Sequence, residues 1–433
     1  MKDIAMFRIQ LFGVIFLSSF FMQCLCAMGQ FNDKTLQEIE IATYQPSPVP
    51  DRIILNLCGD PARQIAVNWR TDNNNNKPFA QIATADGSPN QESNATTIEG
   101  ITSSLKMKDY ISYHHSVRLE KLTPGTKYIY RVGDGQLWSE WMHFTTSKDD
   151  QSAFSFIYFG DAQNDLKSHW SRVIREAYSD MPRASFILHA GDLVDEYNND
   201  QEWGQWFYAA GWINGSIPSI ATPGNHEYRG LDLLSPQWRP HFAFPENGPT
   251  GEYQEKLKET VYYIDYQGTR IICLNTQAMT RKIALAQQRW LEKLLSHNLN
   301  RWTIIFHHHP MFASANNRAG HAQLNLFFKE LYEKHQVDLV LQGHDHSYAR
   351  GEKISIKGKA KEYQSPVYVV SVSGPKMYQG GAVWADVTAS NLQLYQLIHV
   401  NSKQIEFSSY RADGVLYDSF LITKDANGMR KIE

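Results

Sequence analysis

Cysteine is scarce in this sequence. Of 4 cysteines, two lie close to the N-terminus, which leaves Cys58 and Cys273 for the rest of the chain. Each lies on an apolar, strand-like segment in a different predicted domain, so we expect two buried, unpaired thiols. A disulfide framework and a cysteine-ligated metal site are therefore excluded.

An excess of basic residues is also missing. The chain has 42 Lys and Arg against 45 Asp and Glu, a formal net charge of -3. A protein that binds nucleic acid through its phosphates needs a basic surface, so we expect no nucleic-acid partner. Small anionic substrates remain compatible with this charge, because bound metal ions supply local positive charge.

Long hydrophobic runs are absent beyond the N-terminus. There, an apolar stretch over residues 11–22 follows two basic residues and precedes a small-residue cleavage pattern at Ala27 and Gly29. The stretch is short for a membrane-spanning helix and is typical of an export signal. We predict a signal peptide over residues 1–29, a periplasmic or secreted protein, and no stable membrane insertion after cleavage. A single membrane anchor is the alternative.

Length and patterning predict two globular domains. The chain has 433 residues, 42% hydrophobic and 20% charged, which is ordinary for folded proteins. Residues 43–147 contain strand and turn patterns without a convincing helix, such as the alternation of Ile53, Leu55 and Leu57. A proline-glycine turn at 124–125 leads into an alternating aromatic strand. The pattern resembles a fibronectin III-like or Ig-like β-sandwich.

The second predicted domain, residues 153–425, follows a polar linker and alternates strands with helices. We expect helices with apolar residues at helical spacing over 170–178, 286–295 and 324–332. Strands are expected over 154–159, 186–188, 271–274, 303–306 and 339–341, with a further strand before Asn225 and a strand-rich tail from about residue 367 that completes the sheets. Alternation of this kind predicts a layered α/β domain.

Five short segments with possible metal ligands each follow an apolar strand. They are Gly-Asp-Ala-Gln at 160–163, Gly-Asp at 191–192, Gly-Asn-His-Glu at 224–227, His-His-His-Pro at 307–310 and Gly-His-Asp-His at 343–346. Ligands of open α/β sheets bind beyond the carboxyl ends of the strands, so the fold would gather the five segments. One Gly-Asp or Gly-Asn pair is an ordinary turn. All five together predict a site for two hard or borderline metal ions, which suits phosphoester hydrolysis.

These segments resemble the motifs of the purple acid phosphatase-like metallophosphoesterases, within the calcineurin-like phosphoesterase superfamily. The segments at 224–227 and 343–346 match that pattern outright, and His-His-Pro at 308–310 fits the family's His-x-Pro. The resemblance covers nearly the whole mature sequence, including the fibronectin III-like domain that the family also carries. It implies a phosphatase that hydrolyses small phosphate monoesters with two metal ions, chosen among iron, zinc and manganese.

Carried over residue by residue, the resemblance implies two metal sites that share one carboxylate. Asp192 would bridge both ions through its two oxygens. Asn225, His308 and His344 would complete the second site. In the triple-histidine run, the His-x-Pro motif favours His308, and His307 is the alternative.

The first site departs from the family pattern. Asp161 and His346 would hold that ion, but Asp195 stands where the family has an iron-binding tyrosine, and Gln163 stands where it has glycine. We predict that the amide oxygen of Gln163 fills the gap, with Asp195 as the alternative ligand. Without a tyrosinate, we expect a colourless enzyme that uses divalent ions.

The remaining assignments concern catalysis. Asp192 is counted as catalytic because both ions depend on it. His226 follows a ligand directly, so we expect it to contact phosphate and protonate the leaving group, a hydrogen-bonded structural role being the alternative. Glu227 would orient His226. Arg318 and His321 are assigned to substrate binding by position alone.

Two other functions remain open. A phosphodiesterase could use the same metal ions. A surface binding protein with an inactive hydrolase domain is the other possibility, although the full set of ligands argues against it.

Overall fold

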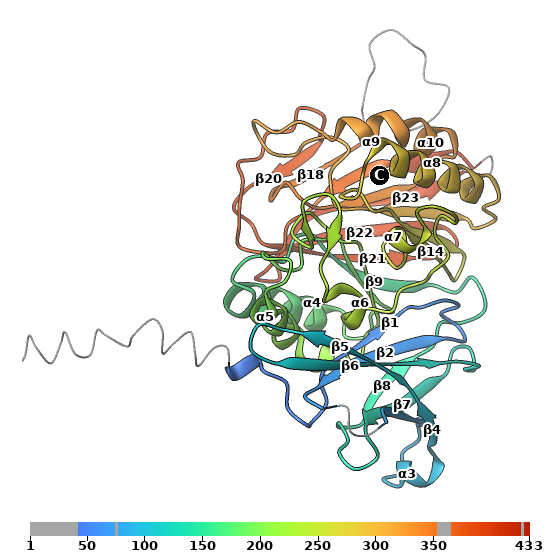
Figure 1. The fold of residues 1–433 in the computed structure, drawn as a ribbon. Coiled ribbons are helices and arrows are strands. Elements are labelled where there is room, and N and C mark those ends of the chain that lie inside the picture. The colour runs from blue at the N-terminus through green and yellow to red at the C-terminus, as the bar shows by residue number, and fades with distance from the viewer. Residues whose placement is uncertain (1–41, 74–76, 353–364, 426–427) are drawn as a thin grey trace, which may run out of the picture. The chain divides into compact units, whose positions relative to one another are not determined.

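The computed structural model describes residues 42–73, 77–352, 365–425 and 428–433 (Figure 1). Residues 46–433 form one unit, and residues 1–45 form a second unit of which only 42–45 are described. The signal peptide predicted over 1–29 lies outside the described residues. Among the helices that the structure describes, none has the length and hydropathy to cross a membrane.

The N-terminal part is a sandwich of two four-stranded layers. One layer has the order β1-β2-β6-β5 and the other the order β4-β3-β7-β8. Inward-facing residues such as Leu55, Val67 and Phe144 form one buried cluster between them, which confirms the predicted β-sandwich. A single helical turn, α3 (Gln91–Asn94), was not expected. The strands are β1 (Asp51–Asn56), β2 (Ile65–Thr71), β3 (Phe79–Thr84), β4 (Thr96–Glu99), β5 (Ile101–Lys106), β6 (Ile111–Leu119), β7 (Lys127–Gly133) and β8 (Met142–Thr145).

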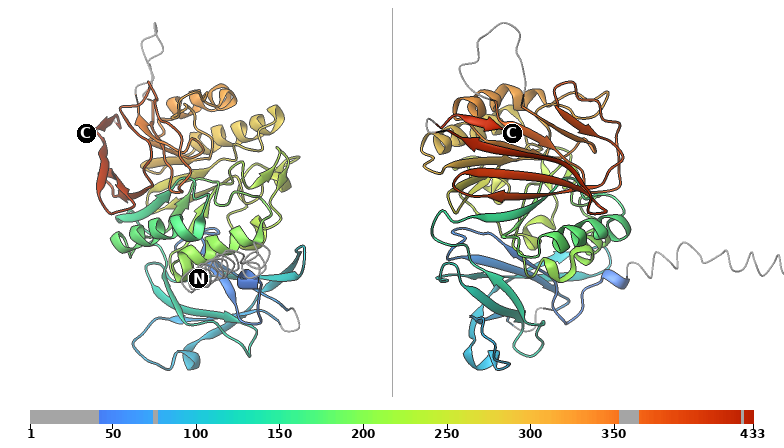
Figure 2. Two further views of the ribbon diagram at one scale, coloured as in Figure 1. Left: turned by 90° about the vertical axis from the view of Figure 1, so that its left-hand side faces the viewer. Right: turned by 180° about the vertical axis from the view of Figure 1, so that it is seen from behind.

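The first sandwich layer continues into the α/β part as one 11-stranded sheet, here called sheet 1. The join is a parallel pairing of β1 with β11, where Asn56 faces Ser219. The predicted C-terminal strands form the other end of sheet 1, because β21 pairs antiparallel with β9, and Figure 2 shows them side by side. The added strands are β9 (Phe154–Phe159), β10 (Ile187–His189), β11 (Ser219–Ala221), β21 (Leu394–Val400), β22 (Gln404–Arg411), β23 (Leu416–Lys424) and β24 (Arg430–Ile432).

A second, 7-stranded sheet, here called sheet 2, has the order β14-β15-β16-β17-β19-β18-β20. It faces sheet 1, and the amide of Gln342 on β17 donates to the Tyr158 hydroxyl on β9 at 3.1 Å. Alternate residues of β15 to β17 point toward sheet 1, such as Ile271 and Ile304. The strands are β14 (Tyr262–Tyr266), β15 (Thr269–Cys273), β16 (Trp302–Phe306), β17 (Leu339–Gln342), β18 (Tyr348–Gly351), β19 (Val367–Val370) and β20 (Val387–Ala389).

Helices pack on the outer face of sheet 2 and on part of the outer face of sheet 1, whose C-terminal strands lie uncovered in Figure 2, and this confirms the layered α/β architecture. On sheet 1, the Trp170 ring packs against Phe159 of β9 at 6.0 Å between centroids. On sheet 2, Ile272 and Ile305 share a buried cluster with Leu291 of α8. The helices are η1 (Leu166–Trp170), α4 (Ser171–Asp180), α5 (Asp200–Ala210), η2 (Gly211–Ile213), α6 (Trp238–His241), α7 (Gln254–Leu257), α8 (Arg281–Ser296), α9 (Ala322–Phe327) and α10 (Lys329–Lys334), and a short hairpin pairs β12 (Tyr228–Arg229) with β13 (Leu233–Leu234).

Two helices differ from the predictions. α8 begins five residues before the expected 286, at Arg281, because the Thr280 side chain caps it by accepting from the amide of Ile283. The helix expected over 324–332 is divided at Phe328, where φ is -119°. Both thiols are buried and free, as expected, although Cys58 lies just after β1 and not on a strand.

Candidate metal centre

The predicted ligands lie in loops that follow β9, β10, β11, β16 and β17. β9, β10 and β11 run parallel in sheet 1, and β16 and β17 run parallel in sheet 2. Their carboxyl ends therefore meet at one edge of the layered structure. This edge brings together all seven residues that were expected to bind metal: Asp161, Gln163, Asp192, Asn225, His308, His344 and His346.

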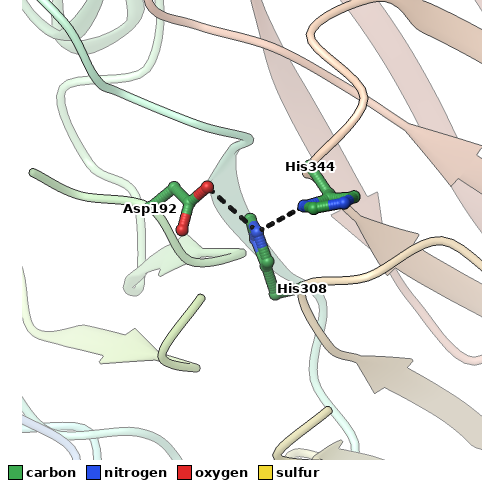
Figure 3. A group of neighbouring side chains, drawn as sticks. All are labelled: Asp192, His308 and His344. Carbon is green, nitrogen blue, oxygen red and sulfur yellow. Dashed lines mark hydrogen bonds and ion pairs between the residues drawn. The ribbon is translucent and has the colours of Figure 1, made fainter. Parts of the chain in front are cut away.

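Two groups of ligand atoms form there, and they share Asp192. One group joins Asp192, His308 and His344 (Figure 3), and the other joins Asp161, Asp192 and His346. Within each group the ligand atoms lie within 4.8 Å of one another. A carboxylate common to two such groups fits two neighbouring metal ions.

In the group with His308, polar atoms converge on its Nε2. Asp192 Oδ2 lies 3.0 Å away, Asn225 Oδ1 3.1 Å and His344 Nδ1 3.2 Å. The other ring nitrogen, Nδ1, lies 2.9 Å from the carbonyl oxygen of Ala190. A proton held at Nδ1 by that carbonyl leaves Nε2 available as a ligand.

In the other group, two buried oxygens have no hydrogen-bond partner among the described residues: Asp161 Oδ2 and Gln163 Oε1. His346 Nε2 lies 3.3 Å from Asp161 Oδ2. The amide nitrogen of Gln163 donates to Asp192 Oδ2 at 3.0 Å, and a half-turn of the amide would bring Oε1 to the same place. Buried polar atoms without partners are costly, so this group fits a bound cation.

The backbone is strained at three of these residues. Asp192, His344 and His346 have φ values of 51°, 77° and 44°. This left-handed region costs non-glycine residues about 1–3 kcal/mol each and clusters at functional sites. Close contacts also require two neighbouring glycines: a Cβ on Gly224 would lie 2.1 Å from Asp192 Oδ1, and one on Gly343 would lie 2.2 Å from Asp161 Oδ1.

The electrostatics of the cluster favour cations. Burial lowers the pKa of His308, but the charges of Asp192 and Asp161 outweigh it and raise that pKa to about 9. Burial and the charge of Asp192 raise the pKa of Asp161 to about 7, against the opposing effect of His308. A site that attracts a proton onto imidazole this strongly has a negative potential that metal ions would neutralise.

His226 lies beside the cluster and belongs to neither ligand group. Its backbone amide donates to Asp192 Oδ1 at 2.9 Å, and its Nδ1 donates to the carbonyl oxygen of Asp195 at 2.5 Å. The Asp195 carboxylate lies 3.3 Å from the same Nδ1 and 3.9 Å from the Lys376 ammonium. Gln163 therefore lies beside the group of Asp161, Asp192 and His346, whereas the Asp195 carboxylate lies with His226 and Lys376.

Glu227 differs from its expected role beside His226. Its carboxylate is fully buried and accepts hydrogen bonds from the amides of Asp192 at 2.9 Å, Leu193 at 2.7 Å and Gly224 at 2.7 Å. It thus ties together the loops after β10 and β11. The amide of Val194, at 3.3 Å, is a fourth donor. Four closely spaced amide hydrogens favour an anionic acceptor, so the Glu227 carboxylate lies with them and not beside the His226 ring.

The three histidines at 307–309 point into different surroundings. His308 enters a ligand group, whereas His307 Nδ1 lies 2.8 Å from the carbonyl oxygen of His309 and its ring stacks on Tyr332. His309 is buried, its Nδ1 lies 3.0 Å from Thr276 Oγ1, and its ring centroid is 4.3 Å from that of His344.

The two residues assigned to substrate by position lie at different depths. Arg318 donates to the carbonyl oxygen of His344 at 3.2 Å and to Asp345 Oδ1 at 3.1 Å. Its guanidinium lies over the Tyr378 ring. His321 is more remote, because its ring packs against His309, with 5.1 Å between the ring centroids.

Lys376 and Tyr378 were missed by the sequence analysis. The carbonyl oxygen of Lys376 lies 3.0 Å from His346 Nδ1, and the Tyr378 ring lies 4.8 Å from the His346 ring. Both follow β19: Lys376 ends a Ser-Gly-Pro-Lys segment at 373–376, and Tyr378 lies two residues further on. The rule that polar turns after buried strands reach the site could have found them.

Two packed sheets between helices, with paired Asp and His groups beyond the strand ends, define a metallophosphoesterase. Residues 154–348 match the family model of the calcineurin-like phosphoesterases, and residues 50–146 match the purple acid phosphatase N-terminal domain. The chain belongs to the purple acid phosphatase-like metallophosphoesterases, which are metal-dependent hydrolases of phosphoric esters.

Named relatives agree with this assignment. Acid phosphatase type 7 of Homo sapiens is 28% identical over 333 residues, 70% of this chain and 71% of that protein. Fe(3+)-Zn(2+) purple acid phosphatase 12 of Arabidopsis thaliana is 25% identical over 277 residues, 59% of this chain and 56% of that protein. The purple acid phosphatase PPD1 from Lupinus luteus seeds has the same fold, with a TM-score of 0.70 at 20% identity over 88% of this chain and 75% of that one.

Proposed function

We propose that this protein is an exported phosphatase that hydrolyses small phosphate monoesters at a binuclear metal centre. The observation that supports it best is the Asp192 carboxylate, which belongs to both ligand groups. We propose that Asp192 bridges the ions, that Asn225, His308 and His344 complete one site, and that the other takes Asp161, Gln163 and His346.

When bound, two such ions clamp the phosphoryl oxygens and activate a water molecule for attack on phosphorus. We assign His226 to the phosphoryl group and the leaving oxygen. Its Nδ1 is held by Asp195, and its side chain is 25% exposed. Its Nε2 has no hydrogen bond within the described part of the chain, so it is free to contact the phosphoryl group and protonate the leaving oxygen.

Arg318 supplies a positive charge for substrate. Its guanidinium is 34% exposed and lies next to the backbone of His344, where it could balance charge on a phosphoryl oxygen. His321 lies behind His309, so we assign it a smaller effect on substrate affinity.

The metal ions are proposed to be divalent, and the enzyme colourless. Asp195 stands where the family has its iron-binding tyrosine, so the tyrosinate that gives the purple colour is missing at that position. Visible absorption spectroscopy of the protein loaded with iron and zinc tests this. We expect no intense band, whereas a purple species would contradict it.

The activity is tested by comparing p-nitrophenyl phosphate with bis(p-nitrophenyl) phosphate on protein loaded with zinc, manganese or ferrous iron. A higher kcat/KM for the monoester is expected. A higher value for the diester would identify a phosphodiesterase. Metal binding without turnover of either ester would identify the surface binding protein with an inactive hydrolase domain.

Export is proposed from residues 1–29. Expression of the full chain with a C-terminal tag should yield a protein that leaves the cytoplasm and begins near residue 30. Cell fractionation and N-terminal sequencing measure both. Retention of the intact N-terminus in a membrane fraction would indicate the anchor instead.

A further inference from the structure

Two buried arginines of the N-terminal sandwich reach the first residue of helix α5. Arg52 on β1 donates to both carboxylate oxygens of Asp200, at 2.6 and 2.9 Å, and to its carbonyl oxygen at 3.0 Å. Arg70 on β2 donates to the same carboxylate at 3.1 Å. The Tyr110 hydroxyl donates to it as well. Three segments of the sandwich therefore hold one residue of the α/β part.

This cluster is expensive to build. The side chains of Arg52, Arg70 and Asp200 are only 3%, 1% and 9% exposed, and the loss of solvation opposes charged groups at such depth. Arg52 also has a φ of 50°, at an irregularity in the pairing of β1 with β2. A strained, desolvated arrangement of this kind persists only where the surroundings impose it.

The first turn of α5 connects Asp200 to the loop beside the metal ligands. Asn199 caps the helix by accepting from the amide of Gln201 at 3.1 Å and donates to Glu202 Oε1 at 2.9 Å. The other oxygen of Glu202 accepts from the amides of Asp195 at 2.7 Å and Glu196 at 2.8 Å. The position of α5 thus determines the position of the loop.

That loop holds His226, since the carbonyl oxygen of Asp195 accepts from its Nδ1 at 2.5 Å. We propose that Arg52 and Arg70 are positioning residues for His226, acting through Asp200, Glu202 and Asp195. The N-terminal domain then forms part of the support of the active site. The inference rests on the catalytic role of His226 in the proposed function.

The competing explanation is that the arginines only hold the two parts of the chain together. A second ion pair between the same parts provides a matched control. Arg118 on β6 lies 3.4 Å from Glu246, with side chains 40% and 46% exposed, and within the described part of the chain neither side chain forms a hydrogen bond or ion pair with α5. Loosening this pair should leave His226 in place.

The experiment compares Arg52→Lys with Arg118→Lys in the full-length, metal-loaded protein. A lysine keeps the charge but loses the two-pronged contact with Asp200. We expect Arg52→Lys to lower kcat about ten-fold by displacing His226, with KM and metal content little changed. Arg118→Lys should retain the original kcat. An unchanged kcat in folded, metal-loaded Arg52→Lys protein would overturn the inference.

A double-mutant cycle separates positioning from general stabilisation. In a His226→Ala background, Arg52→Lys should cause no further loss of kcat, because the residue it positions is gone. Independent, multiplicative losses would overturn the inference and leave the role of His226 intact. A normal kcat in His226→Ala itself would instead overturn that part of the proposed function, and the inference with it.

If Arg52→Lys does not fold, Tyr110→Phe takes its place in the cycle. It removes one hydrogen bond from Asp200 and no charge. We expect about a two- to three-fold loss of kcat, because the loss of one hydrogen bond should displace His226 less than Arg52→Lys does. In the His226→Ala background we again expect no loss. Full activity of Tyr110→Phe, or a loss that persists without His226, would contradict the inference.

Discussion

At the scale of single residues, Asp192 is the position on which both ligand groups depend. We expect Asp192→Asn to lose both ions and at least about 100-fold in turnover, because an amide is a weaker, neutral ligand. Elemental analysis and p-nitrophenyl phosphate hydrolysis measure this. Asp195→Asn is the matched control and should retain two ions per chain. An Asp192→Asn enzyme that keeps its ions and its rate would contradict the assignment.

Gln163 and Asp195 can be distinguished by metal stoichiometry. Gln163 contacts Asp192 and His346, whereas the Asp195 side chain lies with His226 and Lys376. We therefore expect Gln163→Ala to weaken the binding of one ion by about 10–100-fold and Asp195→Ala to bind both ions normally. Metal titrations followed by calorimetry provide the readout. The reverse pattern would show that Asp195 is the ligand.

At the scale of elements, the strand-end loops carry the site, and Glu227 joins two of them. One of its oxygens accepts from Asp192 and Gly224, and the other from Leu193 and Val194. Glu227→Gln leaves a single acceptor oxygen for these amides. We expect a loss of about 1–3 kcal/mol in unfolding free energy, typical of buried donors left unsatisfied, and weaker metal binding. Denaturant unfolding measures it, with the exposed Glu246→Gln as control. Equal stabilities would show that the amides have other partners.

Strands and motifs could be predicted from local sequence because burial and alternation are local properties. The strand at 154–159 appears at its predicted bounds. The predicted ligand segment at 160–163 comes directly after it, as expected. The break at Phe328 and the early start of α8 depend on tertiary packing and a cap. The orientation of Glu227 could not be predicted either, because three of its four partners, the amides of residues 192–194, lie more than 30 residues away along the chain.

At the scale of the whole molecule, the join between β1 and β11 was unpredictable. It rests on one residue pair, Asn56 and Ser219, and on contacts such as Arg52 with Asp200 that are 148 residues apart. The two-layer pattern of 43–147 could be predicted because each strand shows its own alternation. We retain 43–147 and 153–425 as proposed domain limits, with a sheet that runs across them.

Buried histidines where these two parts meet make stability depend on pH. Burial, with the charge of Arg52, lowers the pKa of His114 to about 3, and the neighbouring His241 is also lowered. The unfolded chain takes up protons below its ordinary histidine pKa of about 6.5, while the folded protein does not. Stability is therefore fully present above pH 6.5 and falls as the pH decreases toward 3, by about 1.4 kcal/mol per pH unit for each histidine.

Thermal unfolding at pH 7 and pH 4.5 checks this dependence. The original protein should lose more of its Tm on acidification than His114→Gln, which cannot take up the proton. An identical loss in both proteins would contradict the expectation, provided that they bind the same amount of metal.

The central claim is that two neighbouring cations share the carboxyl group of Asp192. Element-resolved anomalous diffraction from crystals of the metal-loaded, phosphate-soaked protein tests it most directly. We predict two anomalous peaks about 3.5–4 Å apart, one beside each oxygen of Asp192, with phosphate in contact with both. A single peak, or peaks that lie away from this carboxylate, would contradict the account.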